Sequence, residues 1–554
     1  MSSDAGRRVL LLGLDGACFE ALDPLLAAGR LPNLAAWRRG GRSGPLRSTV
    51  PPMSFPAWSS LVTGLSPGEH GLFDFTQKVP GAYAIRFTNA SDRRGATLFA
   101  RVSRAGGRVL SLGVPASFPP EPVRGLLVAG FDAPVSAGTD ARSASDPALY
   151  RRIAARTGPW MRRELDEGAR GEGWREGAVA TLLARIERKE AFALEALSEL
   201  RRAGGAGPEL AMVVFSESDT VAHHFWRDHD PGSPRHDPSA SAARRGALGA
   251  VYERLDAACG ALRRAFGEDA LCAVVSDHGS GGAARRVLHL GRRLADCGLL
   301  RRRAGPRGGA ERLARGARDL ALRALPPRAA ERLFRRARRA AARVESAARF
   351  GGIDWERTLA FCEEANTQPG VWINLAGREA RGAVAPGDYE RVRDDVIAAL
   401  LEWRLPDGGS VVARARRREE VYRGPRVGLA PDVVVELALD AGYGLSLVPT
   451  PWHDPGAPAV RWLEAAELAG GRGRGLNGTH RPEGLWLASG PGAEDLPARA
   501  AIEEVVPTLL RALGLAPDAQ GEASRAGEPP ARVAYTPEEE ALVAERLRAL
   551  GYLE

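Results

Sequence analysis

Residues 8–16 read RVLLLGLDG, and four later stretches repeat the pattern: RVLSLGV at 108–114, GLLVAGFDAP at 125–134, LAMVVFSESD at 210–219 and ALCAVVSDHG at 270–279. Each is a short apolar run that ends near Gly or Asp and leads into a helix-like segment. Continuous apolar strands that alternate with helices are typical of a parallel sheet covered on both faces. The sequence therefore predicts an α/β fold with a mostly parallel central sheet.

Polar side chains stand at the ends of three of these predicted strands. Asp15 follows the first, Asp219 follows the fourth, and Asp277 and His278 follow the fifth. In open α/β sheets, ligands bind beyond the carboxyl ends of the strands. We therefore expect these side chains to contribute to one site.

The overall composition sets the broad class of the protein. The chain has 554 residues, of which 44% are hydrophobic and 26% charged, which is ordinary for a globular protein and excludes a disordered, collagen-like or disulfide-stapled chain. No apolar run approaches the roughly 18 to 20 residues of a membrane-spanning helix, and the N-terminus has no signal-peptide cleavage pattern. Five Cys without C-x-x-C spacing fit a reducing compartment. We expect a cytoplasmic protein, at most peripheral to a membrane.

The positive charge is concentrated in one segment. Residues 281–350 contain 20 Arg and five acidic residues, whereas the remaining chain contains 57 basic and 63 acidic residues. This stretch is rich in Arg and Ala and has an interrupted apolar stripe that predicts helices, broken at Pro326 and Pro327. It is either a solvated helical cap or a basic surface that contacts an anionic membrane or another polyanion.

The predicted organisation has four parts. Residues 1–282 form the first part of the core, 283–350 the Arg-rich helical insertion, and 351–535 the second part of the core, with further strands near 370–375, 430–437 and 484–492 and a helix near 499–513. Residues 536–554 form a C-terminal helix, because Thr536, Pro537 and Glu539 make a capping sequence at its start.

Three segments supply side chains of the kind that bind metals. Asp15 lies between glycines that let the backbone approach an ion, Asp219 and His223 are four residues apart and share a face if helical, and Asp277 with His278 occupies a strand end. Each segment alone is more often a cap, a turn or a surface pair. Together with His480 in NGTHRPEG, they have the composition of a site for two divalent cations.

The candidate nucleophile is Ser54, in STVPPMSFPAWSS. The surrounding prolines predict a stiff turn that leads into a helix of about residues 57–63, so the hydroxyl would lie near helix amides that favour an anion. The rival hydroxyl groups are those of Ser48, Thr49, Ser59, Ser60 and Thr63.

These motifs resemble the alkaline phosphatase superfamily on its phosphodiesterase and nucleotide pyrophosphatase side, with the closest similarity to the bacterial and archaeal phosphohydrolase/phosphomutase group. The resembling stretches occur in family order from residue 8 to about 515 and include GLDGACFEALDPLLAAGRLPNL, GPLRSTVPPMSFPAWSSLVTGLSPGEHGLFDF, GVPASFPPEPVRGLLVAGFDAP, ESDTVAHHFW, SDHGSGG, APDVVV and NGTHRPEGLWLASGPG. The resemblance covers most of the chain.

The resemblance implies a role for each candidate residue. Ser54 takes the position of the catalytic Ser or Thr. One cation would be surrounded by Asp15, Ser54, Asp277 and His278, and the other would be held by Asp219, His223 and His480. The implied activity is hydrolysis of phosphoric esters through a phosphoserine intermediate with two divalent cations, Zn²⁺ with Mn²⁺ as the alternative.

The sequence departs from its relatives shortly after the HG that follows Ser54. Nucleotide pyrophosphatases carry an Asn there that helps to bind a phosphoryl oxygen, whereas this chain has Asp74 and Phe75. Cleavage of nucleotide-type diesters is therefore less expected than hydrolysis of a monoester, hydrolysis of another diester, or phosphoryl transfer. We interpret His70 and His224 as structural residues.

Two classes of function remain open from the sequence. The first is a metal-dependent phosphoric-ester hydrolase acting on a small-molecule or lipid phosphate ester, with a phosphomutase as its variant. The second is a weakly catalytic protein that binds polyanions through residues 283–350, with no specific nucleic acid as partner. Presence of all seven site residues favours the enzyme.

Overall fold

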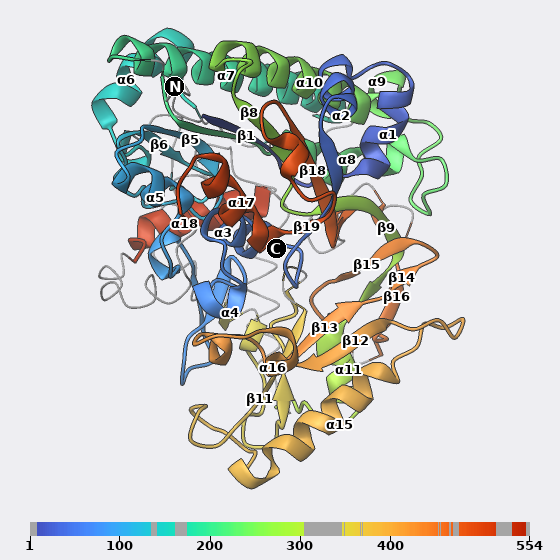
Figure 1. Cartoon of the computed structure of the whole chain (residues 1–554). Helices are drawn as coiled ribbons and strands as arrows, with labels where there is room; N and C mark the ends of the chain where they lie inside the picture. The colour runs from blue at the N-terminus through green and yellow to red at the C-terminus, as the bar shows by residue number, and fades with distance from the viewer. Residues whose placement is uncertain are drawn as a thin grey trace.

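The apolar stretches form the centre of an eight-stranded sheet, as the sequence predicts (Figure 1). Five adjacent strands run parallel, in the order β8-β1-β7-β5-β6. Their bounds are β1 Val9–Leu14, β5 Val109–Val114, β6 Gly125–Ala129, β7 Leu210–Phe215 and β8 Leu271–Val275. Beyond β8 lie β18 (Glu483–Ser489), which is antiparallel to it, then β2 (Arg42–Arg47) and β19 (Ala500–Ala501).

The computed structural model describes residues 8–134, 141–160, 165, 174–205, 207–303, 346–347, 349–365, 367, 369–452, 454, 456–464, 467–468, 476–516 and 534–549.

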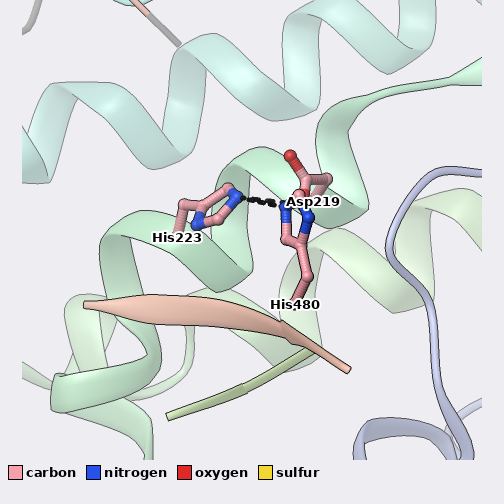
Figure 2. A group of neighbouring side chains, drawn as sticks. All are labelled: Asp219, His223 and His480. Carbon is pink, nitrogen blue, oxygen red and sulfur yellow. Dashed lines mark hydrogen bonds and ion pairs between the residues drawn. The ribbon is translucent and has the colours of Figure 1, made fainter. Parts of the chain in front are cut away.

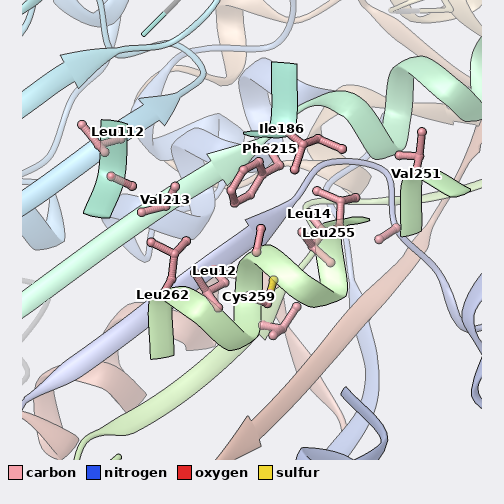
Figure 3. Close-up of a cluster of buried hydrophobic side chains, with 14 of the residues drawn as sticks. Leu12, Leu14, Leu112, Ile186, Val213, Phe215, Val251, Leu255, Cys259 and Leu262 are labelled. Carbon is pink, nitrogen blue, oxygen red and sulfur yellow. The ribbon is translucent and has the colours of Figure 1, made fainter. Parts of the chain in front are cut away.

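Alternate residues of β1 enter two different cores, because the central strands are buried on both faces. Leu10, Leu12 and Leu14 pack with α7 (Trp174–Arg202) and α10 (Ala247–Phe266) on one face, part of which Figure 3 shows. Val9 and Leu11 pack with α3 (Ser54–Thr63) and α17 (Val505–Ala512) on the other face. The central strands are thereby fixed between two helical layers.

Two smaller sheets lie below the large one in Figure 1. A five-stranded sheet contains β9 (Gly279–Leu288), β14 (Leu439–Asp440), β15 (Tyr443–Leu447), β16 (Val460–Trp462) and β17 (Gly478–Arg481). A four-stranded antiparallel sheet contains β10 (Ala360–Phe361), β11 (Gly370–Ile373), β12 (Val412–Arg417) and β13 (Val433–Leu437).

The four-stranded sheet packs with α11 (Leu290–Asp296) and α15 (Tyr389–Leu401) around one apolar cluster. We call residues 290–303 and 346–437 the second lobe, and the eight-stranded sheet with its flanking helices the first lobe. The second lobe also contains the short helix α16 (Arg418–Val421).

The predicted Arg-rich insertion is described only at its margins. Residue 283 lies inside β9, and α11 follows directly, so the start of this segment is part of the folded sheets. The helices expected on both sides of Pro326 and Pro327, and with them the predicted polyanion surface, lie outside the described residues.

The other predicted elements occur with adjusted boundaries. The helix expected near 499–513 begins at Val505, because residues 500–501 pair with β2 as β19. The C-terminal helix α18 spans Pro537–Ala549, and a hydrogen bond of 2.8 Å from the Thr536 amide to Glu539 Oε2 closes the predicted capping box. Within the described part of the chain, no helix is long and apolar enough to cross a membrane.

Candidate metal centre

The site forms where three neighbouring parallel strands end. Asp15 directly follows β1, the central strand of the three, and Asp277 and His278 connect β8 to β9. After β7 the chain turns into α8 (Glu217–His229), which carries Asp219 in its first turn. Strand order alone therefore brings Asp15 together with side chains that lie more than 200 residues away in the sequence.

Asp219, His223 and His480 form one half of the site (Figure 2). The helical spacing predicted for the first two is correct, because His223 Nε2 lies 3.2 Å from Asp219 Oδ1. His480 reaches the same oxygen from β17, at 3.5 Å, and its Nε2 lies 2.9 Å from Nε2 of His223. We call these residues the helix half of the site.

Asp15, Asp277 and His278 form the sheet half. His278 Nε2 lies 3.6 Å from Asp15 Oδ1 and 3.4 Å from Asp277 Oδ2, and all three side chains are buried. The amide of Gly16 donates to Asp277 Oδ1 at 3.2 Å. Gly16 has a φ of +66°, and a Cβ atom there would lie 2.8 Å from Asp219 Oδ1. Glycine therefore lets the turn after β1 lie against the Asp219 carboxylate.

The two halves share Asp219. Asp15, Asp219 and His278 have donor atoms close enough to bind a single ion, as do Asp219, His223 and His480. The rings of His278 and His480 also stack across the two halves, with centroids 3.7 Å apart. Asp219 thus lies between two potential ion positions, whereas the resemblance assigned it to one.

Each of the three histidines uses Nδ1 to hold a backbone carbonyl. The acceptors for His223, His278 and His480 are the carbonyl oxygens of Gly478, Gly279 and Pro52, at 2.9, 3.0 and 2.8 Å. A carbonyl can only accept, so Nδ1 carries the proton in each ring and Nε2 is directed into the site. Metal-binding histidines commonly have their other nitrogen fixed in this way.

Burial and mutual repulsion act on the carboxylates of the sheet half. Burial, followed by the charges of Asp277 and Asp219, raises the pKa of Asp15 well above its ordinary value. Burial also raises the pKa of Asp277 to about 8, and burial and His480 lower the pKa of His278. The sheet half thus disfavours its own charged forms, so a bound cation would be strongly stabilising there.

The helix half behaves differently. Burial opposes the ionisation of Asp219, but its interactions with His223 and His480 outweigh burial and lower its pKa well below the ordinary value. Asp219 therefore remains a carboxylate that faces two imidazoles.

The residues present fit two divalent cations. Asp15 Oδ1, Asp277 Oδ2, His278 Nε2 and Ser54 Oγ are buried atoms with no hydrogen-bond partner among the described residues. Between His223 and His480, two nitrogens whose rings already donate through Nδ1 approach to 2.9 Å, which brings two lone pairs together unless a proton or a cation lies between them. Mixed carboxylate and imidazole donors suit Zn²⁺ and Mn²⁺.

Ser54 begins α3, which two hydrogen bonds connect to the site. His480 donates to the carbonyl of Pro52, two residues before Ser54, and Trp58, one turn after it, donates from Nε1 to Asp15 Oδ2 at 3.2 Å. The helix starts three residues earlier than predicted. The amides of its first turn cannot bond within the helix, so they favour an anion beside the Ser54 hydroxyl.

His70 and His224, the two histidines interpreted as structural, make contacts with residues other than the candidate metal ligands. The Leu72 amide donates to Nδ1 of His70, so Nε2 of His70 carries the proton and donates to Ser60 Oγ at 3.0 Å. Burial lowers its pKa to about 3. His224 packs edge-on against Trp174, with centroids 5.7 Å apart.

One supporting group was not expected from the sequence. Glu217, which precedes Asp219 on α8 by two residues, is fully buried and contacts Arg185 at 3.1 Å and Lys189 at 2.9 Å. These two cations lie on α7 and fix the first turn of α8. Lys189 is one of only two lysines among 77 basic residues. A lysine in a chain that otherwise uses arginine was the signal in the sequence that could have pointed to this contact.

The sequence matches the family of type I phosphodiesterases and nucleotide pyrophosphatases over residues 9–445. The chain belongs to this family. As a type I phosphodiesterase/nucleotide pyrophosphatase family member, it is a hydrolase acting on phosphoric ester bonds, in a family whose substrates are small-molecule phosphate esters or nucleotides. The catalytic apparatus of such an enzyme must bind a phosphoryl group and offset its negative charge.

Two solved structures similar to this family member are phosphonoacetate hydrolase from Sinorhizobium meliloti 1021, in complex with phosphonoacetate, and human ectonucleotide pyrophosphatase/phosphodiesterase 5. The first is 16% identical and covers 92% of this chain and 95% of its own, with a TM-score of 0.48. The second is 12% identical with the same coverages and a TM-score of 0.45. No curated protein matches the sequence.

Proposed function

We propose that this enzyme hydrolyses phosphoric esters through a phosphoserine intermediate on Ser54, with two divalent cations held by Asp15, Asp219, Asp277 and three histidines. The observation that carries the proposal is the convergence of three imidazole Nε2 atoms and three carboxylates at the start of α3. The histidines are His223, His278 and His480.

Ser54 supplies the nucleophilic oxygen. Its Oγ attacks phosphorus, the P–O bond to the leaving alcohol breaks, and the phosphoryl group becomes esterified to the serine. The serine proton passes to the departing alcohol. Water then attacks phosphorus and gives up a proton, the bond between phosphorus and Oγ breaks, and Oγ regains a proton. The product is phosphate from a monoester substrate and a phosphate monoester from a diester substrate. The helix N-terminus at Ser54 favours the negative charge of the phosphoryl group throughout both steps.

The cations supply the activation that an isolated serine lacks. When bound, they lower the pKa of the Ser54 hydroxyl and offset the charge of the phosphoryl oxygens. Asp15, Asp277 and His278 would hold the cation beside Ser54, His223 and His480 would hold the second, and Asp219 lies within reach of both positions. We propose Zn²⁺ as the physiological metal, with Mn²⁺ as the alternative.

The residues after the HG sequence favour substrates other than nucleotide diesters. Asp74 is buried, accepts a hydrogen bond of 2.7 Å from the Thr367 hydroxyl, and accepts another from the Phe75 amide. Phe75 packs against Phe55, with centroids 4.4 Å apart. Neither side chain offers an amide donor to a phosphoryl oxygen, so we propose a small-molecule or lipid phosphate ester as substrate.

The test compares p-nitrophenyl phosphate with a p-nitrophenyl phosphodiester, using wild type and Ser54→Ala after chelation and re-addition of Zn²⁺ or Mn²⁺. We expect activity that returns with metal in the wild type and is lost in Ser54→Ala, and the preferred ester identifies the substrate class. Turnover that persists in Ser54→Ala would refute the serine mechanism. Phosphoenzyme formation with transfer to an added alcohol in place of water would identify a phosphomutase.

A further inference from the structure

The loop that leads into α3, residues 50–53, is held through its carbonyl groups. Pro51 and Pro52 have no backbone N–H, so this proline loop can donate little to its surroundings. The carbonyl oxygens of residues 50, 51 and 52 instead accept three successive side-chain hydrogen bonds. The donors are Tyr422 at 2.7 Å, Thr49 at 2.8 Å and His480 at 2.8 Å.

These three donors come from different parts of the molecule. Thr49 directly precedes the loop, and His480 belongs to the metal centre. Tyr422 belongs to the second lobe, follows α16 and is buried. The position of the proline loop, and therefore of Ser54 directly after it, depends on a hydroxyl group that lies 372 residues away in the sequence.

The second-lobe segment that begins at Tyr422 also contacts the chain after α3. The amide of Arg426 donates to the carbonyl of Gly68, in the short helix α4 (Pro67–His70), at 2.8 Å. A side chain at Gly68 would collide with the backbone of Arg423, so the two segments are in direct backbone contact. Phe73 packs edge-on against Tyr422, with centroids 5.0 Å apart.

Residues 422–426 therefore contact both segments that flank α3, one before Ser54 and one after Thr63. Backbone hydrogen bonds, a close glycine contact and an aromatic pair are arrangements that fix position, because they tolerate little displacement. None of these groups is among the candidate metal ligands. The contacts thus constrain where α3 sits without binding the metals themselves.

We propose that residues 422–426 are a clamp that positions the helix bearing Ser54, with Tyr422 as its positioning residue. The inference rests on the proposed function, since it gives Ser54 the role of nucleophile. The second lobe then holds the attacking oxygen in line with the phosphorus atom. A small displacement of a reacting group costs a large factor in rate.

The test uses Tyr422→Phe, which removes one hydroxyl and keeps the ring against Phe73. We expect kcat to fall about five- to tenfold, the size of one lost hydrogen bond, while KM and the number of bound Zn²⁺ ions stay within about twofold of wild type. Hydrogen–deuterium exchange should become faster in peptides that cover the proline loop and α3, and in those peptides selectively.

The matched control is Tyr389→Phe. Tyr389 lies on α15 of the same lobe, and its hydroxyl donates at 2.7 Å to Oδ1 of Asp432, which belongs to the second lobe as well. This control removes a comparable hydrogen bond, so it should leave kcat and the exchange of α3 unchanged whatever its effect on thermal stability.

Unchanged exchange and unchanged kcat in Tyr422→Phe would overturn the clamp, as would an equal loss in Tyr389→Phe. Failure of the proposed function is distinguishable from failure of the clamp. If Ser54→Ala keeps its activity, the serine mechanism is wrong, whereas the exchange measurement, which needs no turnover, still decides whether Tyr422 holds α3.

Discussion

The metal centre and the junction between the lobes are both buried and polar, but their main polar side chains differ in whether they have hydrogen-bond partners. In the centre, Ser54 Oγ and His278 Nε2 have no hydrogen-bond partner among the described residues. At the junction, Tyr422 donates to the carbonyl of Val50, Asp74 accepts from Thr367, and Lys78 pairs with Glu379. Buried polar atoms are normally satisfied. The two unsatisfied atoms of the centre therefore fit a bound ligand, and the three satisfied side chains of the junction make contacts that fix position.

The largest effect should come from the residue that both halves of the centre share. Asp219→Ala removes the oxygen that lies 3.2 Å from His223 Nε2 and 3.5 Å from His480 Nε2. We therefore expect activity to fall by about 10³-fold or more and bound metal to drop below the wild-type number per chain. Steady-state rates and elemental analysis of the purified protein measure the two quantities.

Asp407→Ala is the control, because Asp407 is an exposed residue of the second lobe that pairs with Arg286 at 2.7 Å. A full complement of metal in Asp219→Ala would contradict the assignment of this residue to the centre.

The two lysines allow a sharper comparison of the two regions. Lys189 contacts Glu217 behind the metal centre, and Lys78 on β3 (Thr76–Lys78) contacts Glu379 at the junction, at 2.7 Å. Each buried glutamate also has an arginine partner at about the same distance, and these are Arg185 at 3.1 Å and Arg378 at 3.0 Å. The pairs are thus closely matched in burial and partners.

Lys189→Met and Lys78→Met should therefore destabilise the protein to a similar extent, by about 1 to 3 kcal/mol, because each leaves one arginine on the glutamate. Only Lys189→Met should weaken Zn²⁺ binding, by about 10- to 100-fold, since Glu217 fixes the turn that carries Asp219. Chemical denaturation and a competition titration with a chelator measure the two effects. Equal loss of metal affinity in both variants would remove the distinction between the regions.

A smaller effect is expected from Asp74 at the junction. Burial raises the pKa of Asp74 to about 7, from about 3.9 in an unfolded chain. The folded protein therefore holds a proton on this group that the unfolded chain releases, so the stability contribution is complete below about pH 4 and is lost as the pH rises through about 7. Asp74→Asn cannot ionise and escapes this loss.

Thermal unfolding of the chelator-treated protein checks the sign. The advantage of Asp74→Asn over wild type should grow between pH 5 and pH 8, to on the order of 2 kcal/mol. Thr367→Val should enlarge the total loss in the wild-type background, because the Thr367 hydroxyl donates to Asp74 and lowers its pKa. An advantage that is constant with pH would show that Asp74 does not titrate in this range.

The sequence predicted the parallel sheet and indicated much of the candidate site because both follow from local patterns. The apolar runs at β1, β7 and β8 are continuous, and a polar residue follows each, so the amino-acid order alone indicates where these strands end and which side chains stand there. The i, i+4 spacing of Asp219 and His223 likewise needs only a helix. Local regularity was sufficient for these features.

Other features of the candidate site depend on contacts between distant segments of the chain, which no local sequence pattern indicates. The position of Asp219 between both halves depends on how α8 leaves β7, and the contact of Tyr422 with Val50 depends on the packing of one lobe against the other. The early start of α3 at Ser54 follows from the extended residue before it, Met53. The contacts of Asp219 and of Tyr422 join segments that lie hundreds of residues apart, and a single sequence carries no signal for them.

Locating the phosphoryl group tests the role of Ser54 most directly. Wild-type enzyme loaded with Zn²⁺ is mixed with p-nitrophenyl phosphate or its diester, quenched in acid during the first turnovers, digested and analysed by mass spectrometry. We expect the phosphoryl group on Ser54 in the peptide that contains the start of α3, as phosphate from the monoester and with its second ester group retained from the diester. We expect none in chelated enzyme. Phosphate on Ser59 or Ser60, or an unmodified peptide from enzyme that turns over at full rate, would contradict the role of Ser54.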